Sequence, residues 1–404
     1  MAIFHGLGTA VALVIVVSAL PGSAFAAGTT DKTAMPGMGG MAKKARVELA
    51  SSAAFAENGQ LLAVAKQGDH LLLYRSDDQG TRWSSPVIVN ALPEAISGDG
   101  ENRPKILFTQ DGGVLVSWTK PLAKPNTGEV RLARSNDGGA SFATPITVHR
   151  DRQEITHRFE SMTVGGDGRV YVAWIDKRDL ESARATKKPY RGAAIYAAVS
   201  DDGGRSFKPE VKIADHSCEC CRIAAAVDSD GAPLILWRHV FEPNERDHAL
   251  AKLGAGGTPI TVERATFDRW KVDGCPHHGP ALAVAPDGTR HAVWFNQKDG
   301  EGRVFHGRLT QNSIDGQRPV GGERAAHADL VVAGRQVAIV WKEFDGERTQ
   351  LRAEISGDGG NSFRQLELGA ANGASDHPRA IKRGNDLFAY WRTEREGMRV
   401  FRLQ

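Results

Sequence analysis

The sequence predicts an all-β protein whose strands form a β-propeller, a ring of four-stranded antiparallel blades. One observation is a hairpin motif that recurs at residues 135–142, 200–207 and 356–363, with a looser copy at 76–83. The other is a series of tryptophans that end apolar runs at intervals of 47 to 63 residues: Trp118, Trp174, Trp237, Trp294, Trp341 and Trp391. Short strands repeated at such even spacing are typical of propeller blades.

The repeated motif has the pattern Ser-x-Asp-x-Gly-x-x-aromatic and is flanked by short apolar runs. Aspartate favours a tight turn because its side chain bonds the backbone that follows, and glycine adopts the positive φ that a hairpin needs. We expect the closing aromatic side chain to pack the hairpin against its neighbour. The bulky tryptophans are expected to fill the wedges between blades.

Residues 1–26 have the features of a secretory signal peptide. Their apolar run, residues 7–20, is too short to span a bilayer, and residues 24–26, Ala-Phe-Ala, form a small-x-small cleavage signal. We expect the mature chain to begin near Ala27 and to be periplasmic or secreted. Without cleavage the run would act as a membrane anchor. No other long apolar run follows it, so no membrane span is expected in the mature chain.

The charge of the chain is close to balanced, with 51 Lys and Arg against 48 Asp and Glu and a formal net charge of +3. Residues 1–26 contain none of these four residue types, so the mature chain has the same charge. This balance gives no basis for binding nucleic acid or an anionic surface. We expect a metal ion, a small ligand or another exported protein as the partner.

Residues 27–44 are rich in Gly, Thr, Ala and Met and show no periodicity, which predicts a flexible arm. The arm contains Met35, Met38 and Met41, three of the six methionines of the chain. Thioethers are soft ligands that suit Cu(I), so the tract is a candidate auxiliary copper site. The alternative interpretation is a low-complexity linker.

Residues 45–404 are predicted to form a single propeller domain. The modules repeat every 50 to 60 residues or so, which gives seven blades. The last module, residues 379–403, has only three predicted strands. A lone strand at residues 45–49 would complete it and close the ring, which removes exposed sheet edges. Six blades would result instead if residues 254–264 were an insertion.

The Ser-x-Asp-x-Gly-x-[Ser/Thr]-[Phe/Trp] hairpins resemble the Asp-box, or BNR, repeats of the sialidase-like propeller superfamily. Three copies match in full, and the fourth has Arg82 where Ser or Thr is expected. The resemblance covers residues 45–404. It implies Asp boxes on the outer rim, between the third and fourth strands of a blade and remote from any active site. The boxes therefore imply architecture and leave the activity open.

The resemblance also implies an alternative function, an exo-sialidase-like glycoside hydrolase. In that family three arginines grip the substrate carboxylate, and a Tyr–Glu pair supplies the nucleophile. Arg103, Arg158 and Arg379 begin predicted innermost strands and are the candidate arginines, with Glu160 as the candidate carboxylate. Residues 102–106 lack the order of the family's Arg-Ile-Pro motif, and no matching nucleophilic tyrosine or acid aspartate stands out.

The predicted starts of the innermost strands are unusually rich in cysteine and histidine. They face a common funnel, and all four cysteines of the chain lie there, in Cys218-Glu219-Cys220-Cys221 and in Cys275-Pro276-His277-His278. Soft sulfur and nitrogen ligands gathered in this way suit Cu(I) or Zn(II). We therefore expect a binding protein that handles a soft metal, copper or zinc, through Cys218, Cys220, Cys221, Cys275, His277 and His278.

The cysteines allow further interpretations: structural disulfides, redox chemistry, or one disulfide together with a histidine-rich metal site. An exported protein with an even number of cysteines commonly oxidises them, and Cys275 could bridge to Cys220 or Cys221. The propeller would then be a protein-interaction scaffold with structural disulfides. If residues 218–221 continued a strand, Cys218 and Cys220 would share one face and Cys221 would point away.

Overall fold

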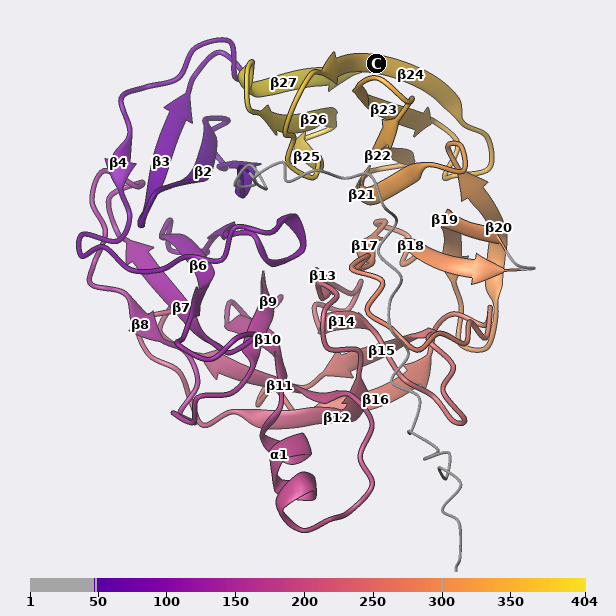
Figure 1. Cartoon of the computed structure of the whole chain (residues 1–404). Coiled ribbons are helices and arrows are strands. Elements are labelled where there is room, and N and C mark those ends of the chain that lie inside the picture. The colour runs from indigo at the N-terminus through magenta and orange to yellow at the C-terminus, as the bar shows by residue number, and fades with distance from the viewer. Residues whose placement is uncertain (1–46, 48, 299–300) are drawn as a thin grey trace, which may run out of the picture. The chain divides into compact units, whose positions relative to one another are not determined.

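The computed structural model describes Val47, residues 49–298 and residues 301–404. Between Arg46 and Gln404 the chain forms seven antiparallel sheets arranged as a ring (Figure 1). The first strand of each sheet lies towards the centre of the ring and the last strand towards its rim. The prediction of a seven-bladed β-propeller is confirmed. The predicted signal peptide and methionine arm lie outside the described residues.

The first three blades follow the chain without a crossover. They comprise β1 (Ser51–Phe55), β2 (Leu61–Gln67), β3 (His70–Ser76) and β4 (Val87–Ile88); β5 (Lys105–Phe108), β6 (Val114–Pro121), β7 (Gly128–Ser135) and β8 (Ile146–Thr147); and β9 (His157–Val164), β10 (Val170–Asp176), β11 (Ala193–Ser200) and β12 (Val211–Ser217). A 3-10 turn, η1 (Gly100–Asn102), precedes the second blade, and α1 (Arg178–Ala185) interrupts the third.

The next three blades repeat this order. They comprise β13 (Ala224–Val227), β14 (Pro233–Arg238), β15 (His248–Leu253) and β16 (Pro259–Arg264); β17 (Ala281–Val284), β18 (Arg290–Lys298), β19 (Glu301–Leu309) and β20 (Ile314–Val320); and β21 (Ala325–Ala333), β22 (Gln336–Phe344), β23 (Thr349–Ser356) and β24 (Arg364–Ala371). Since β16 is a regular fourth strand, residues 254–264 belong to a blade and are not an insertion.

The seventh blade has three strands among the described residues: β25 (Arg379–Arg383), β26 (Asp386–Thr393) and β27 (Gly397–Leu403). Of the strand predicted at residues 45–49, only Val47 and Leu49 are described, and neither belongs to a strand. The seventh blade packs directly on the first, where the rings of Phe55 and Phe388 lie 4.9 Å apart. The guanidinium of Arg392 also donates to the carbonyl oxygen of Leu49 at 2.8 Å.

The six marker tryptophans are the largest buried side chains of the propeller, and each is at most 1% exposed: Trp118, Trp174, Trp237, Trp294, Trp341 and Trp391. They belong to the apolar clusters that join successive blades. The prediction that they fill the wedges between blades is therefore confirmed.

All four Asp boxes connect the third strand of a blade to the fourth, as the resemblance implies. In each, the serine hydroxyl donates to the aspartate: Ser76 to Asp78 at 2.9 Å, Ser135 to Asp137 at 2.6 Å, Ser200 to Asp202 at 2.6 Å and Ser356 to Asp358 at 2.7 Å. The same hydroxyl accepts the backbone N–H of the glycine four residues after the serine, at 2.7 to 2.8 Å. One side chain pair thus closes the whole turn.

Replacing a box aspartate is expected to destabilise the blade. Asp202 accepts hydrogen bonds from Ser200 and from the backbone and hydroxyl of Ser206, so Asp202→Ala should lower the free energy of unfolding by about 2 kcal/mol. The neighbouring Asp201 makes only exposed ion pairs, with Arg169 and Lys208, and Asp201→Ala should have little effect. Urea unfolding of both variants checks this, and equal effects would contradict it.

The same box predicts a pH dependence. Burial by itself raises the pKa of Asp202, but the hydrogen bonds from Ser200 and Ser206 outweigh it and lower the pKa to about 2. A lowered carboxyl pKa stabilises the folded state fully above about pH 4, and that stability is lost as the pH falls towards 2. The difference in unfolding free energy between wild type and Asp202→Ala should therefore shrink across this window.

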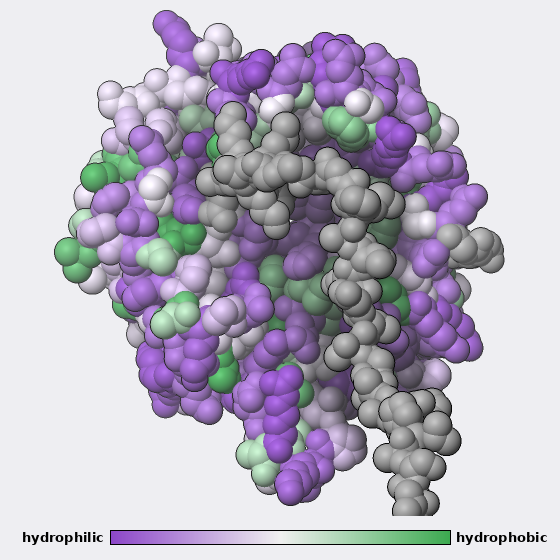
Figure 2. Space-filling model, viewed as in Figure 1, coloured by the Kyte–Doolittle hydropathy of each residue, from purple (hydrophilic) through white to green (hydrophobic). Residues whose placement is uncertain are grey.

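The surface seen in Figure 2 is predominantly hydrophilic over the rim, and hydrophobic residues occur there in small separate groups. The charged stretch at residues 176–191 contains α1, which projects from the ring beside β11 (Figure 1). Among the described residues, no helix has the length and apolarity needed to cross a membrane.

Candidate functional site

The first strands and the loops that lead into them surround two hollows that share one residue, Glu101. We call the first the channel pocket; it has a volume of about 160 Å3 and is lined by residues in or just before the seven innermost strands, β1, β5, β9, β13, β17, β21 and β25. We call the second the Cys/His cavity; it has a volume of about 650 Å3. Its lining residues are Asp99, Gly100, Glu101, Asn126, Thr156, Arg158, Phe159, Lys177, Glu219, Cys220, Cys275, His277, His278, His327 and His377.

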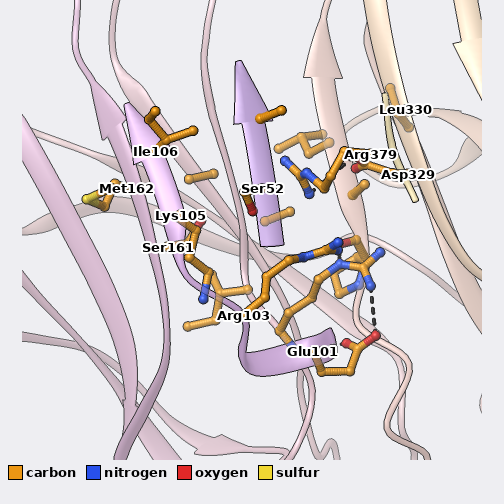
Figure 3. A pocket seen from close by; sticks show the side chains of 18 residues that line it. Ser52, Glu101, Arg103, Lys105, Ile106, Ser161, Met162, Asp329, Leu330 and Arg379 are labelled. Atoms are coloured by element: carbon orange, nitrogen blue, oxygen red, sulfur yellow. Dashed lines mark hydrogen bonds and ion pairs between the residues drawn. The ribbon is translucent and has the colours of Figure 1, made fainter. Parts of the chain in front are cut away.

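Three arginines converge on the channel pocket: Arg103, Arg222 and Arg379. Figure 3 labels Arg103 and Arg379 among the side chains that line it. Arg222 pairs with Glu101 at 2.8 Å and Arg379 with Asp329 at 3.2 Å. Arg103 is 2% exposed, and only its Nη1 finds a partner, the backbone oxygen of His377. Burial, and then the two neighbouring cations, lower the pKa of Arg103 to about 10.

The structure groups the arginines differently from the expected trio. Arg158 does not line the channel pocket; it lines the Cys/His cavity, with its guanidinium 3.6 Å from Asp99. Arg222 takes its place beside Arg103 and Arg379. The candidate carboxylate Glu160 is fully buried and pairs with Lys105 at 3.1 Å, because both are on adjoining innermost strands.

No Tyr–Glu pair forms in the part of the chain that the structure describes. The hydroxyl of Tyr171 donates to Asp167, that of Tyr190 to Asp215 and that of Tyr196 to Asp179. Tyr390 is buried in the seventh blade, and its hydroxyl has no hydrogen-bond partner. The nucleophile that a sialidase requires is therefore not assembled from these side chains.

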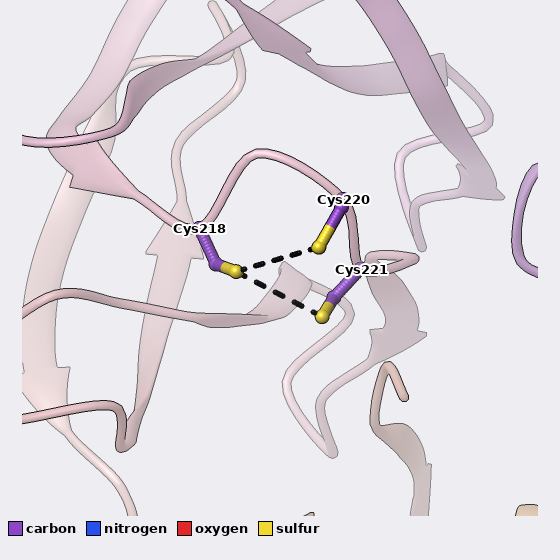
Figure 4. A group of neighbouring side chains, drawn as sticks. All are labelled: Cys218, Cys220 and Cys221. Atoms are coloured by element: carbon purple, nitrogen blue, oxygen red, sulfur yellow. Dashed lines mark hydrogen bonds between the residues drawn. The ribbon is translucent and has the colours of Figure 1, made fainter. Parts of the chain in front are cut away.

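Three thiols meet in the loop between β12 and β13 (Figure 4). The Sγ atom of Cys218 lies 3.9 Å from those of both Cys220 and Cys221, and the three residues are 1%, 5% and 2% exposed. Cys275, in the loop before β17, joins them: its Sγ lies within 4.8 Å of both Cys220 Sγ and a ring nitrogen of His277. The sequence-predicted cluster of four thiols is thus brought together.

Two expectations about the cysteines were wrong. All four are unbridged, and Cys275 lies within 4.8 Å of Cys220 without a bond between the two sulfurs. The pairing of Cys275 with Cys220 or Cys221 is therefore not formed. Residues 218–221 also do not continue a strand, since β12 ends at Ser217. The loop frees the three side chains from strand alternation, so Cys221 turns to the same centre as Cys218.

The surroundings of the cluster favour deprotonation of one cysteine, Cys218, to the thiolate. Hydrogen bonds from Cys220, Cys221 and Cys275 hold the pKa of the Cys218 thiol well below its usual value. The guanidinium of Arg246 also points at Cys218 Sγ, 3.8 Å away. The pKa values of Cys220 and Cys221 are raised, because both act as donors to Cys218. A cation that binds here would replace their protons.

Of the remaining predicted ligands, only one joins the thiol cluster. His277 reaches the thiol cluster, but His278 does not join it: its ring stacks on Phe295 and on His327, with centroids 4.3 Å apart in both pairs. His278 still lines the same cavity. Met35, Met38 and Met41 lie outside the described residues.

A second cluster on the wall of the cavity was not predicted as a site. Glu101 Oε1 lies 3.0 Å from Nδ1 of His327 and 3.5 Å from Nδ1 of His377, and the two rings stack at 3.5 Å. The other carboxylate oxygen accepts the backbone N–H groups of Arg222 and Gly279. The sequence signal was the set of histidines in or just before four innermost strands, β9, β17, β21 and β25, and nothing in it pointed to Glu101.

Strained backbone accompanies this cavity. Phe159, His277 and His327 have φ values of 57°, 53° and 54°, which are costly for residues other than glycine. Phe159 lies in β9 where its pairing with β10 shifts register, opposite Ala173 to Ile175. His327 lies in β21 where its pairing with β22 shifts register, between Ala326 and Asp329. Such bulges re-aim side chains and occur often beside functional sites. The cavity is therefore the candidate functional site.

Comparisons with known proteins identify the fold. No protein-family model matches the chain, and no curated protein matches it. A solved protein of unknown function from Dyadobacter fermentans is 16% identical, with a TM-score of 0.52, over 80% of this chain and 96% of its own. An ulvan lyase bound to -[GlcA(1-4)Rha3S]- is 12% identical, with a TM-score of 0.57, over 86% and 90%. An α-L-arabinofuranosidase from Fusarium graminearum, in complex with an iminosugar inhibitor, is 11% identical, with a TM-score of 0.50, over 76% and 93%.

These similarities bear on the fold alone, because all three identities are low. The chain has the propeller fold that its Asp boxes imply, and glycoside hydrolases and lyases share that fold. A shared fold does not transfer an activity, which depends on the residues of the site.

Proposed function

We propose that this propeller binds a soft metal ion, Cu(I) first and Zn(II) second, at the thiols of Cys218, Cys220, Cys221 and Cys275. The observation that supports the proposal is the pair of 3.9 Å separations between buried sulfurs. Thiolates bound to one ion at about 2.3 Å lie roughly 3.8 to 4.0 Å apart. Unbridged sulfurs at this spacing suit a shared ion better than they suit a disulfide.

The surroundings of the thiols fit a cation held by thiolates. Arg246 and the buried Arg238 place positive charge beside the cluster, which compensates the excess negative charge of several thiolates around a monovalent ion. Cys218, Cys220 and Cys221 exclude water on their side, whereas Cys275 and His277 are exposed and give the ion a way in. The Met35, Met38 and Met41 arm would deliver Cu(I) to this entrance in the periplasm or outside the cell.

A thiol count followed by a metal titration tests the proposal. The purified mature protein is expected to have four free thiols without reduction, and to bind one equivalent of Cu(I) in competition with a chromogenic chelator. The variant with all four cysteines replaced by serine should lose this binding while its circular dichroism spectrum stays unchanged. Absence of free thiols, or Cu(I) binding that survives the four substitutions, would overturn the proposal.

A second candidate function, an enzyme that acts on an acidic saccharide, is supported by two observations. The comparisons favour it over metal binding, because the fold is shared with an ulvan lyase and an arabinofuranosidase. The channel pocket also gathers Arg103, Arg222 and Arg379, and the Nη2 atom of Arg103 has no partner there. Guanidiniums bind carboxylates in a bidentate manner, so a uronic or sialic acid is the expected substrate class.

Two product assays separate the candidates. Metal-free protein is incubated with a fluorogenic sialic acid glycoside and with a glucuronate-containing polysaccharide. Released fluorophore, new reducing ends or unsaturated products would support the second candidate. If neither substrate yields product while Cu(I) binds at the thiols, metal binding alone remains.

A further inference from the structure

We propose that Glu101, His327 and His377 form a second metal site in the Cys/His cavity, for a borderline divalent cation such as Zn2+ or Cu2+. The three ligand atoms are Glu101 Oε1 and the Nδ1 atoms of the two histidines. The two nitrogens lie 3.0 and 3.5 Å from Oε1, and all three atoms lie within 4.8 Å of one another. This second site is independent of the proposed thiol site.

The spacing fits one shared ion. Zinc binds imidazole nitrogen and carboxylate oxygen at about 2.0 to 2.2 Å, so two ligand atoms on the same ion lie roughly 3 to 3.5 Å apart. Two histidines and one glutamate are a ligand set that zinc enzymes use when a fourth position stays open to water or substrate. Here the open position would face the 650 Å3 cavity.

A buried ring nitrogen without a hydrogen-bond partner indicates that a bound species, here a cation, belongs beside it. His377 is 8% exposed, and its Nδ1 atom is buried with no hydrogen-bond partner. Buried polar atoms are normally satisfied, so an unpaired one on a functional wall calls for an explanation. A cation between this nitrogen and Glu101 Oε1 would satisfy it. His278, stacked on His327, has a second unpaired buried Nδ1 on the same wall.

The imidazoles are ready to act as ligands. Burial, more than any other cause, lowers the pKa of His327 to about 4 and holds that of His377 well below its usual value, so both rings are neutral at physiological pH. His327 now donates its Nδ1 proton to Glu101; on metal binding that proton would move to Nε2 of the same ring. The guanidinium of Arg222 donates to the same Oε1 atom at 2.8 Å, so the ion would share this oxygen with it. The backbone N–H groups of Arg222 and Gly279 hold the other oxygen in place.

The backbone around the cluster is shaped to hold it. His327 has a φ of 54° within the bulge of β21, a strain that serves to turn its ring inwards. Gly100 leaves room for the other ring, because a Cβ atom there would lie 2.5 Å from Nδ1 of His377. Asp99 and Glu219 line the same cavity, where they pair with Arg158 and Lys177.

Zinc stoichiometry tests the proposal in three proteins. Wild type is expected to bind two equivalents of Zn2+, the variant with four Cys→Ser substitutions one, and His327→Gln with His377→Gln one. Cu2+ bound to the thiol-free variant should show nitrogen superhyperfine coupling in its electron paramagnetic resonance spectrum. Adding the two histidine substitutions should weaken that Cu2+ binding by at least about 100-fold.

A matched control uses another buried pair of stacked histidines. His291 and His306 lie in blade five, 5.5 Å apart, without a glutamate between them, so His291→Gln with His306→Gln should leave both equivalents. If the site variant fails to fold, Gly100→Ala is compared with Gly256→Ala, where a Cβ atom meets nothing within 4 Å. Gly100→Ala should reduce Zn2+ binding from two equivalents to one, whereas Gly256→Ala should still bind two.

The outcomes separate the two metal sites. If the wild type and the four-serine variant each bind one equivalent of Zn2+ and the histidine variant binds none, the thiol site is refuted and the Glu101–His327–His377 site is supported. Two equivalents in the histidine variant, or no binding to a folded serine variant, would overturn the second site.

Discussion

Cys218→Ser is expected to lower the affinity for Cu(I) by at least about 100-fold, the largest effect of any single cysteine substitution. Cys218 is the hub of the cluster, because its sulfur lies 3.9 Å from two other sulfurs and carries the lowered thiol pKa. Loss of an outer partner of a metal ligand already costs 10- to 100-fold in affinity, so loss of the central ligand should cost more. Competition with a Cu(I) chelator measures the change.

Cys275→Ser supplies the internal comparison. Cys275 is exposed and lies at the entrance, so a serine or water can replace it with less loss, and we expect about 10-fold. Ser217→Ala, beside Cys218 but without a sulfur, controls for disturbance of the loop and should leave the affinity unchanged. If Cys218→Ser and Cys275→Ser had equal effects, Cys218 would not be the central ligand.

Glu101→Gln is expected to lower the free energy of unfolding by about 3 to 5 kcal/mol. The carboxylate is 3% exposed, and it bonds the guanidinium and backbone of Arg222, the backbone of Gly279 and the ring of His327. It therefore ties the entry of blade two to those of blades four, five and six. The amide would leave the charge of Arg222 buried and uncompensated. Urea unfolding of the metal-free protein measures the loss.

A double-mutant cycle isolates the ion pair. Arg222→Met alone should also destabilise, since it leaves the Glu101 carboxylate without its cation. The double variant Glu101→Gln with Arg222→Met should be more stable than the sum of the two losses predicts, because replacing both partners removes the unpaired charge. Additive losses would show that the pair contributes nothing beyond its separate contacts.

The pH dependence gives the same pair a second readout. Burial by itself raises the pKa of Glu101, but the charge of Arg222 and the neighbouring imidazoles of His327 and His377 outweigh it and hold the pKa well below its usual value. The stability that Glu101 contributes is therefore complete above about pH 4.5 and is lost as the pH falls through its folded-state pKa. Wild type should lose its advantage over Glu101→Gln only in acid.

Much of the fold could be predicted from the sequence because its signals are local. The turn of an Asp box lies within eight residues, as the bonds from Ser200 to Asp202 and Gly204 illustrate. Trp174 and its equivalents end apolar strands at nearly constant spacing, and each is buried. Repetition adds to these local signals, because each blade needs its neighbours to bury its faces.

The candidate site was predicted only in part. The cysteines and His277 were identified by residue type and by their place before innermost strands. The structure does not bring Arg158 and Glu160 together with Arg103: Arg158 lines a different hollow from Arg103, and Glu160 lines neither. Glu101 gave no signal, since a single glutamate beside a turn is ordinary on its own.

By itself, the sequence predicted a propeller, with seven blades favoured over six, and cysteines and histidines gathered at one end of its blades. Only the tertiary structure decided which of those ligands meet. Cys218 and Cys221 face one another because the loop after β12 breaks strand alternation, and His327 turns inwards at a bulge. Glu101 reaches Arg222, 121 residues away, because ring closure makes distant blades neighbours across the channel. Periodicity determines where a strand lies, whereas contacts across the centre depend on loops and bulges that no period describes.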